Sequence, residues 1–312
     1  MSVLLMISGL GLLLLPGLSQ PVGRRLVPST WSWICLVALV GGTLMIEGLF
    51  LLYAAPTVLR AIGIPGLAAL CQHMLNVLVP GGPILGWLGA GAAFIVTGGM
   101  AIAVGKYRRI TRLVRVGCAH REHRAIGSCD LVVLPTEAVM AVSIAGSPPQ
   151  VIVSEGLVDM LSDEEFAAVL SHESAHLAHN HHRFLTFASA IEHGFCCLPL
   201  IRRSTHALRT GIERWADEEA IAASPEGRTC LRSALVKVTS SFGNSMLPAF
   251  SGPETLVERL SALRDDSPRQ TPLSLGLILV PGSLLGGTGT VAMGTTFATI
   301  WTVIAAAGHC PL

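Results

Sequence analysis

Charge in this chain is confined to its middle. Of the 21 Lys and Arg residues, 18 lie between Lys106 and Thr271, and so do 19 of the 20 Asp and Glu residues. The 312 residues are 51% hydrophobic and only 13% charged, whereas a soluble domain carries about 25% charged residues. Uncharged apolar flanks of this length are typical of membrane proteins. We therefore divide the chain into an N-terminal part (1–105), a polar middle region (106–271) and an apolar tail (272–312).

Three apolar stretches in the N-terminal part predict membrane-spanning helices: residues 2–17, 31–54 and 83–105. The second and third are long enough for roughly 30 Å of hydrocarbon. Residues 56–82 are apolar but interrupted by Gly and Pro, so we expect only a short interfacial helix there, around 67–78. Glu47 is the one charged residue inside these spans. We expect its side chain to snorkel toward the membrane surface or to pack inside the bundle. The alternative is a functional role, because carboxylates inside a membrane are often functional.

The tail and the basic residues complete the predicted topology. Residues 272–308 carry no charge and predict one span, roughly 284–307, with two short spans as the alternative. Basic residues are enriched in cytoplasmic loops. Arg24 and Arg25 lie in the first loop, and five Lys and Arg residues follow the third span between 106 and 115. We therefore expect an N-terminus outside the cell and a cytoplasmic middle region.

Net charge and cysteine spacing exclude two classes of function. The net charge of +1 argues against direct contact with nucleic acid. The eight cysteines include no Cys-x-x-Cys pair. We therefore expect free thiols rather than a disulfide framework or a thiolate metal site.

The middle region contains the motif His172-Glu173-Ser-Ala-His176. Two histidines four residues apart on a helix share one face, one turn apart. Both imidazoles can then reach one tetrahedral zinc ion. Glu173 follows the first histidine and is placed to act as a general base toward a water molecule. The motif predicts a zinc hydrolase.

The segment before the motif supports a helix there. Ser162 and Glu165 have capping-box spacing in front of an apolar-periodic run, so we expect a helix from about Asp163. Two short β-branched runs precede it, at 131–134 and 151–153, and we expect strands. The Gly-Ser-Pro-Pro turn at 146–149 predicts a hairpin between residues 139–144 and 151–153.

A third ligand is expected from a later helix. Glu213 and Asp217 lie four residues apart on one face of a helical stretch that begins after Gly211. Glu213 can complete a set of two His and one Glu. Asp217 can accept the remaining N–H of a ligand histidine. A solvent-facing acidic helix is the alternative.

Other polar residues near the two motifs have weaker predicted roles. We expect His179, His181 and His182 to be solvated or to lie behind the ligands. Phe184 to Ile201 is apolar, and we expect one helix packed against the membrane face, because a true span would place the two motifs on opposite sides of the bilayer. His193, His206 and Arg209 are candidate oxyanion stabilisers.

These residues carry a family resemblance. Leu161-Ser-Asp-Glu-Glu-Phe, His172-Glu173-x-x-His176, Glu213-x-x-Ala-Asp217 and Glu258-Arg-Leu resemble integral-membrane zinc metallopeptidases of the BlaR/MecR antibiotic-sensor type, and more distantly the HtpX type. The resemblance covers residues 100 to 265. It implies His172, His176 and Glu213 as zinc ligands, Glu173 as general base and Asp217 behind the ligands. It implies a mainly α protein of multiple membrane helices with an inserted α+β zincin-like (gluzincin) metallopeptidase domain, located in a bacterial plasma membrane.

The chain departs from the BlaR/MecR pattern at its C-terminal end. Those sensors continue into an extracellular penicillin-binding domain, whereas this sequence has no Ser-x-x-Lys motif. We therefore expect no direct acylation by a β-lactam.

The resulting functional expectation is a zinc endopeptidase that cleaves a cytoplasmic protein. The resemblance suggests a transcriptional repressor as substrate, in regulated proteolysis. HtpX-like quality control of membrane proteins is the first alternative, and an inactive membrane scaffold is the second. The expected partners are a protein substrate and the lipid bilayer, and a homo-oligomer stays open.

Overall fold

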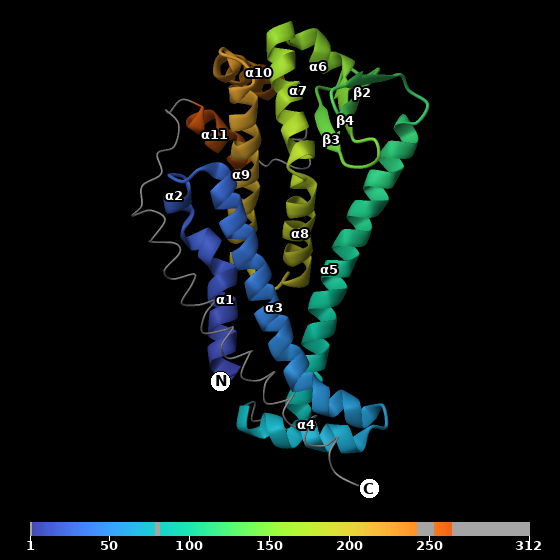
Figure 1. Cartoon of the computed structure of the whole chain (residues 1–312), viewed down its shortest axis with the longest axis vertical. Coiled ribbons are helices and arrows are strands. Elements are labelled where there is room, and N and C mark those ends of the chain that lie inside the picture. Colours follow the sequence, from blue (N-terminus) through green and yellow to red (C-terminus); the bar gives the residue numbers. More distant parts are fainter. Residues whose placement is uncertain (1, 79–81, 242–252, 264–312) are drawn as a thin grey trace.

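A computed structural model describes residues 2–78, 82–241 and 253–263 (Figure 1). The described chain is mostly helical, with one four-stranded sheet above a bundle of long helices. The predicted span in the tail lies outside the described residues. The domain limits at 106 and 272 stay predictions, and so does the direction in which the chain crosses a membrane.

Three apolar helices occupy the predicted spans. They are α1 (Ser2–Leu18), α3 (Pro28–Ala61) and α5 (Pro83–Cys118). Among the described residues, α3 and α5 are long and apolar enough to cross a membrane, and α1 is a shorter apolar helix. Helix α4 (Pro65–Leu78) lies where the short interfacial helix is predicted. Helix α5 continues well beyond the predicted end of its span at Gly105.

Glycines bring these helices close together. A Cβ added to Gly42 on α3 would lie 2.7 Å from the carbonyl oxygen of Gly9 on α1. A Cβ on Gly89 of α5 would lie 2.8 Å from the carbonyl oxygen of Phe50 on α3. Small residues allow such close approach between membrane helices.

The apolar stretch after the motif is a helical hairpin, so the single helix predicted for residues 184–201 is wrong. Helix α8 (His181–Gly194) runs down beside α5, and α9 (Pro199–Ala222) returns beside α1 and α3 (Figure 1). Helix α8 ends at Gly194, and Pro199 suits the first turn of the new helix. The motifs at 172–176 and 213–217 can then lie on one side of the bundle, although the hairpin that connects them extends into the bundle.

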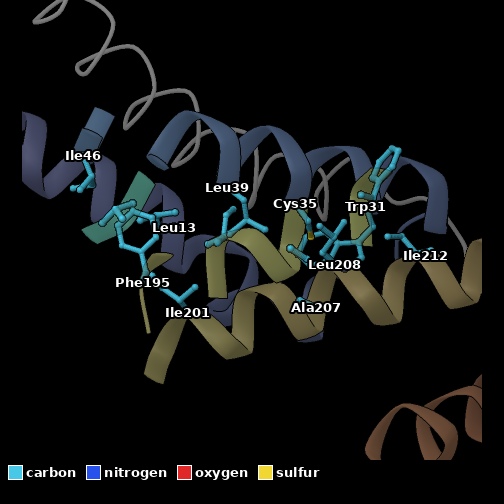
Figure 2. Packing of buried hydrophobic residues seen from close by; sticks show 14 of the residues in the cluster. Leu13, Trp31, Cys35, Leu39, Ile46, Phe195, Ile201, Ala207, Leu208 and Ile212 are labelled. Carbon is cyan, nitrogen blue, oxygen red and sulfur yellow. The ribbon is translucent and has the colours of Figure 1, made fainter. Parts of the chain in front are cut away.

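The hairpin shares a hydrophobic core with the N-terminal helices (Figure 2). Leu13 of α1, Leu39 of α3 and Leu208 of α9 are fully buried in this cluster. Trp31, at the start of α3, is 2% exposed, and its ring is 3.0 Å from the position that a Cβ on Gly211 would take. Helix α9 is therefore packed directly against α1 and α3.

The sheet has the order β1-β2-β4-β3. Its strands are β1 (His123–Ile126), β2 (Cys129–Leu134), β3 (Ala141–Ile144) and β4 (Gln150–Ser154). Antiparallel pairing of β3 with β4 confirms the predicted hairpin. Parallel pairing of β2 with β4 places β3 at one edge, where it contacts the motif helix α7 (Asp163–Ala178). Short helix α6 (Glu155–Met160) connects β4 to the Ser162 cap.

Two further helices pack against α9, α10 (Gly227–Ser241) and α11 (Pro253–Ala262). Arg24, after the short helix α2 (Gln20–Gly23), forms an ion pair with Glu258 of α11. The carbonyl oxygen of Arg24 also accepts a hydrogen bond from Arg214 of α9 at 3.1 Å. The first loop and the motif helices therefore lie on the same side of the bundle.

Candidate metal centre

The motif helix begins with the predicted capping box. The Ser162 hydroxyl accepts from the backbone N–H of Glu165, and the Glu165 carboxylate accepts from the backbone N–H of Ser162 at 2.9 Å. Glu165 also accepts from Ser233 at 2.6 Å and from Lys237 at 2.7 Å, both on α10. The start of α7 is thus fixed to its neighbour, and the motif follows within the same unbroken helix.

Three predicted ligands from α7 and α9 converge. The Nε2 atoms of His172 and His176 are 3.2 Å apart. Glu213 places Oε2 3.6 Å from the first of these nitrogens and Oε1 3.8 Å from the second. All three side chains are buried. Sequence reasoning therefore identified three side chains that the fold brings together from segments about forty residues apart.

This triad fits a zinc ion. Atoms bound roughly 2.1 Å from a tetrahedral ion lie roughly 3.4 Å from one another, close to the three distances above. One ligand atom from each residue lies within 4.8 Å of the others. Imidazole nitrogens and a carboxylate are preferred zinc ligands. His172, His176 and Glu213 would hold the ion.

Asp217 lies behind the first histidine, as predicted. Its Oδ1 is 3.0 Å from Nδ1 of His172, and the side chain is buried. A carboxylate at Nδ1 keeps the proton on that nitrogen and leaves Nε2 free to act as a ligand. Asp217 therefore orients His172 toward the triad.

His181 lies behind His176 in the same way that Asp217 lies behind His172. It is 0% exposed, and its Nδ1 lies 3.1 Å from Nδ1 of His176. An unprotonated Nδ1 on His181 can accept a hydrogen bond from the Nδ1–H of His176, which keeps the proton on that nitrogen and leaves Nε2 of His176 free. The ring is held against Trp215, with 4.8 Å between ring centroids. Of the two roles predicted for His181, the structure places it behind the ligands.

Sequence reasoning assigned no role to Arg259. This residue of α11 is 7% exposed and donates to both oxygens of Asp217, at 2.9 and 2.6 Å. Its third nitrogen lies 3.1 Å from Oε2 of Glu213. The Glu258-Arg-Leu pattern was part of the family resemblance, but no spacing rule connects α11 to α9.

The histidines at the centre differ in their protonation. Burial lowers the pKa of His176, and it lowers that of His181 to about 3 with help from the neighbouring His176 and His179 rings. Burial acts on His172 in the same direction, but contacts with Asp217 and Glu213 raise its pKa to about 9. A metal ion must displace the proton of His172, so binding is expected to release a proton.

The carboxylates at the centre are ionised. Burial would raise the pKa of Glu213, but His172, His176 and Arg259 hold it below the usual range. Arg259 and His172 likewise hold the pKa of Asp217 low against its burial.

The charges at the centre call for a divalent cation. Glu173, Glu213 and Asp217 contribute three negative charges and Arg259 one positive charge, so the centre carries −2 once His172 has released its extra proton. Buried charges of one sign are costly without a partner. A single Zn²⁺ would balance them, which agrees with the ligand distances.

Glu173 lies beside the triad without belonging to it. It is half-buried and close enough to act electrostatically on His176 and Arg259. Its role as general base stays a prediction.

The candidate oxyanion stabilisers lie elsewhere. Arg209 forms an ion pair with Glu192 inside the hairpin, at 3.3 Å. His193 contacts the Ser189 carbonyl near the end of α8, twelve residues or roughly 18 Å along the helix from His181. His206 lies on α9 seven residues before Glu213, roughly 10 Å along the helix.

Comparisons with known proteins agree with this site. The sequence profile described as Peptidase family M48 matches residues 141–210, from β3 into α9. Plastoglobule-localized metallopeptidase 48, a chloroplastic protein of Arabidopsis thaliana, is 29% identical over 103 residues. That alignment covers 33% of this chain and 28% of the relative. No solved structure matches the chain significantly.

Both matches support a metalloprotease, and neither distinguishes the BlaR/MecR type from the HtpX type. The profile match includes His172, Glu173 and His176 but ends before Glu213. The third ligand therefore rests on the geometry of the triad.

Proposed function

We propose that this chain is a membrane-embedded zinc endopeptidase. The observation that carries the proposal is the meeting of His172, His176 and Glu213 within 4.8 Å. Glu173 next to this triad supplies the base that a hydrolase needs, and the similarity to metallopeptidases supports the same reaction class.

The residues of the centre divide the work of peptide hydrolysis. A bound zinc ion would polarise the scissile carbonyl and lower the pKa of a water molecule. Glu173 takes a proton from the water and delivers it to the leaving amine. Asp217 and His181 keep the two imidazoles in the ligand tautomer. Arg259 holds the carboxylates of α9 in place.

The edge strand β3 provides a place for the substrate backbone. It pairs with β4 on one side, and the described strands leave its other side unpaired. It also contacts α7, which carries the motif. An extended peptide can add to such an edge through main-chain hydrogen bonds. The substrate is therefore a segment that can become extended beside α7.

The centre lies close to the ends of the membrane helices. The backbone N–H of Gly17, at the end of α1, donates to Ser204 of α9 at 3.1 Å. Glu213 is nine residues further along α9, roughly 14 Å, and Gly211 packs on Trp31 at the start of α3. We infer that cleavage occurs near the membrane surface, on the side of the first loop. The positive-inside rule makes that side cytoplasmic.

The biological role is proposed at two levels. The family resemblance favours regulated cleavage of a cytoplasmic transcriptional repressor, in a bacterial plasma membrane. The position of the centre at the end of the bundle also suits quality control of membrane proteins, whose cytoplasmic segments emerge there. An inactive scaffold would not need a buried triad with a neighbouring base.

The test compares Glu173→Gln with Glu226→Gln, an exposed residue, in the full chain. Both variants should bind about one zinc per protein. Glu173→Gln should lose cleavage of a protein substrate by about 10²-fold or more, while Glu226→Gln keeps it. Full proteolysis by Glu173→Gln would overturn the assignment. Less than half an equivalent of zinc in the unmodified protein would favour the scaffold.

A substrate trap distinguishes the two roles. Glu173→Gln should bind substrate without releasing products, so cross-linked partners can be identified. Capture of one DNA-binding protein supports regulated proteolysis, and capture of many membrane proteins supports quality control.

A further inference from the structure

The C-terminal part of α5 forms a surface that the proposed peptidase reaction does not use. Helix α5 is unbroken from Pro83 to Cys118, whereas its predicted span ends at Gly105. The remaining thirteen residues add roughly 20 Å of helix, which rises toward the sheet (Figure 1). If α5 crosses a bilayer, this part begins at the level of the lipid headgroups.

This part of α5 is strongly basic and carries no counter-charge. Its cations are Lys106, Arg108, Arg109, Arg112 and Arg115. No acidic residue occurs in the sequence from 48 to 121. Within the described chain, the side chains of the first four cations are exposed and make no ion pair or hydrogen bond. Four guanidinium or ammonium groups are therefore available to an outside anion.

Three of the arginines line one groove. Arg108, Arg112 and Arg115 recur at i, i+4 and i+7 and share a helix face. A shallow, open groove of about 490 Å³ follows this face; its described lining comes from α5 and the adjoining Ala119, and it also includes Tyr107, Thr111 and Val116. Guanidinium groups bind phosphate through paired N–H donors, and the two hydroxyls can add hydrogen bonds.

The groove extends from the membrane end of the helix to the peptidase sheet. At its far end, Arg115 donates to the carbonyl oxygen of Pro148 at 2.8 Å. Pro148 lies in the turn between β3 and β4. An anion in the groove would therefore lie between the bilayer and the strand pair that borders α7.

Exposed apolar residues on the preceding part of the same helix indicate what kind of anion the groove takes. Phe94, Ile95 and Ile102 of α5 are 80%, 63% and 68% exposed, and acyl chains would cover them if α5 crosses a bilayer. A lipid whose phosphate lies at Arg108 and Arg112 has its acyl chains along this part of the helix. A soluble phosphate compound or an acidic protein segment would not reach it.

We propose that this groove binds the phosphate-bearing headgroup of an anionic lipid. Arg108 and Arg112 contact the phosphate, and the acyl chains lie against the apolar part of α5 that precedes Lys106. The site rests on the proposed membrane location but needs neither zinc nor Glu173, so lipid binding and proteolysis can fail separately.

Native mass spectrometry of the full chain in neutral detergent tests this site. The protein is mixed with equal amounts of phosphatidylglycerol and phosphatidylcholine that have the same acyl chains. Phosphatidylglycerol should be retained preferentially. Arg108→Gln/Arg112→Gln should reduce its retention by about fivefold or more, since one cation near an anionic surface contributes about fivefold.

The matched control is Arg121→Gln/Arg124→Gln, which removes two exposed arginines near β1. This variant should retain phosphatidylglycerol as well as the unmodified protein does. Both variants should have the same Tm as the unmodified protein. Equal retention of the two lipids, or equal loss in both variants, overturns the proposal. Complete displacement by excess inorganic phosphate would also overturn it and assign the groove to a soluble anion.

Discussion

Arg259 holds Asp217 by both carboxylate oxygens, through bonds of 2.9 and 2.6 Å that join α11 to α9. The same guanidinium reaches Glu213 at 3.1 Å. One cation therefore neutralises part of the charge on the third ligand and on the residue that orients the first ligand. The arrangement keeps two carboxylates ionised side by side in a buried site even before a metal is bound.

Replacing Arg259 should destabilise the metal-free protein most. Arg259→Met leaves Glu213 and Asp217 buried without their cation, and the loss of one partner from a buried ion pair costs about 3–5 kcal/mol. Thermal unfolding with and without zinc checks this, because zinc should restore part of the loss. Arg232→Met, on the exposed face of α10, is the control. Equal Tm values for the two variants would contradict the role of Arg259.

His181→Phe should weaken metal binding without disturbing the packing greatly. Phenylalanine can fill the space against Trp215, but it cannot accept a hydrogen bond from the Nδ1–H of His176. Loss of a group that orients a metal ligand typically costs 10- to 100-fold in affinity. Competition with a zinc chelator measures the change. His182→Phe, on the neighbouring residue, should leave zinc affinity within about twofold, and a similar loss in both variants would argue for a packing effect only.

A pair of adjacent glycines tests whether the hairpin docks on α5. A Cβ on Gly99 would lie 2.7 Å from the carbonyl oxygen of His193, whereas a Cβ on Gly98 would meet no atom within 4 Å. Gly99→Ala should therefore lower stability by about 1–3 kcal/mol through overpacking, and Gly98→Ala should be neutral or slightly stabilising. Thermal unfolding in one detergent compares them. A neutral Gly99→Ala would mean that α8 and α5 are not in close contact.

The contact between Glu165 and Lys237 should contribute stability that depends on pH. Burial would raise the pKa of Glu165, but hydrogen bonds from Lys237 and Ser233 lower it from 4.5 to about 2. A carboxyl group with a depressed pKa stabilises the fold fully above its unfolded pKa, and the contribution is lost as pH falls from 4.5 toward 2.

Glu165→Gln should therefore be less stable than the unmodified protein at pH 7, by no more than about 1 kcal/mol because Lys237 is partly exposed. The difference should shrink toward pH 3. Thermal unfolding at both values measures it, with Glu155→Gln on the exposed first turn of α6 as the control. A difference that is constant with pH would show that Glu165 acts only as a cap.

Local patterns in the sequence predicted much of the site. The capping box at Ser162, the helix from Asp163 and the pairing of β3 with β4 all depend on neighbouring residues, and the structure confirms them. The convergence of Glu213 on the motif was also predicted, because the four-residue spacing to Asp217 is that of a ligand and its supporting group.

The missed features depend on distant contacts or on an ambiguous pattern. Arg259 lies 42 residues after Asp217, and no periodicity relates them. The apolar run from Phe184 suits a surface helix and a buried hairpin equally well. Gly194 and Pro199 were the available signal, because a glycine that packs on α5 and a proline at a helix start mark a turn.

Because α9 is one unbroken helix, it determines which form of this protein can be purified and assayed. From Pro199 to Glu213 the helix covers roughly 21 Å, and its first half is built into the core formed with α1 and α3. A soluble fragment made by removing residues 1–105 would keep both motifs in its sequence yet expose Leu208 and Ile212 and lose the packing that aims Glu213. Excision of the catalytic part would thus discard the scaffold of its own third ligand, so the chain has to be purified and assayed whole.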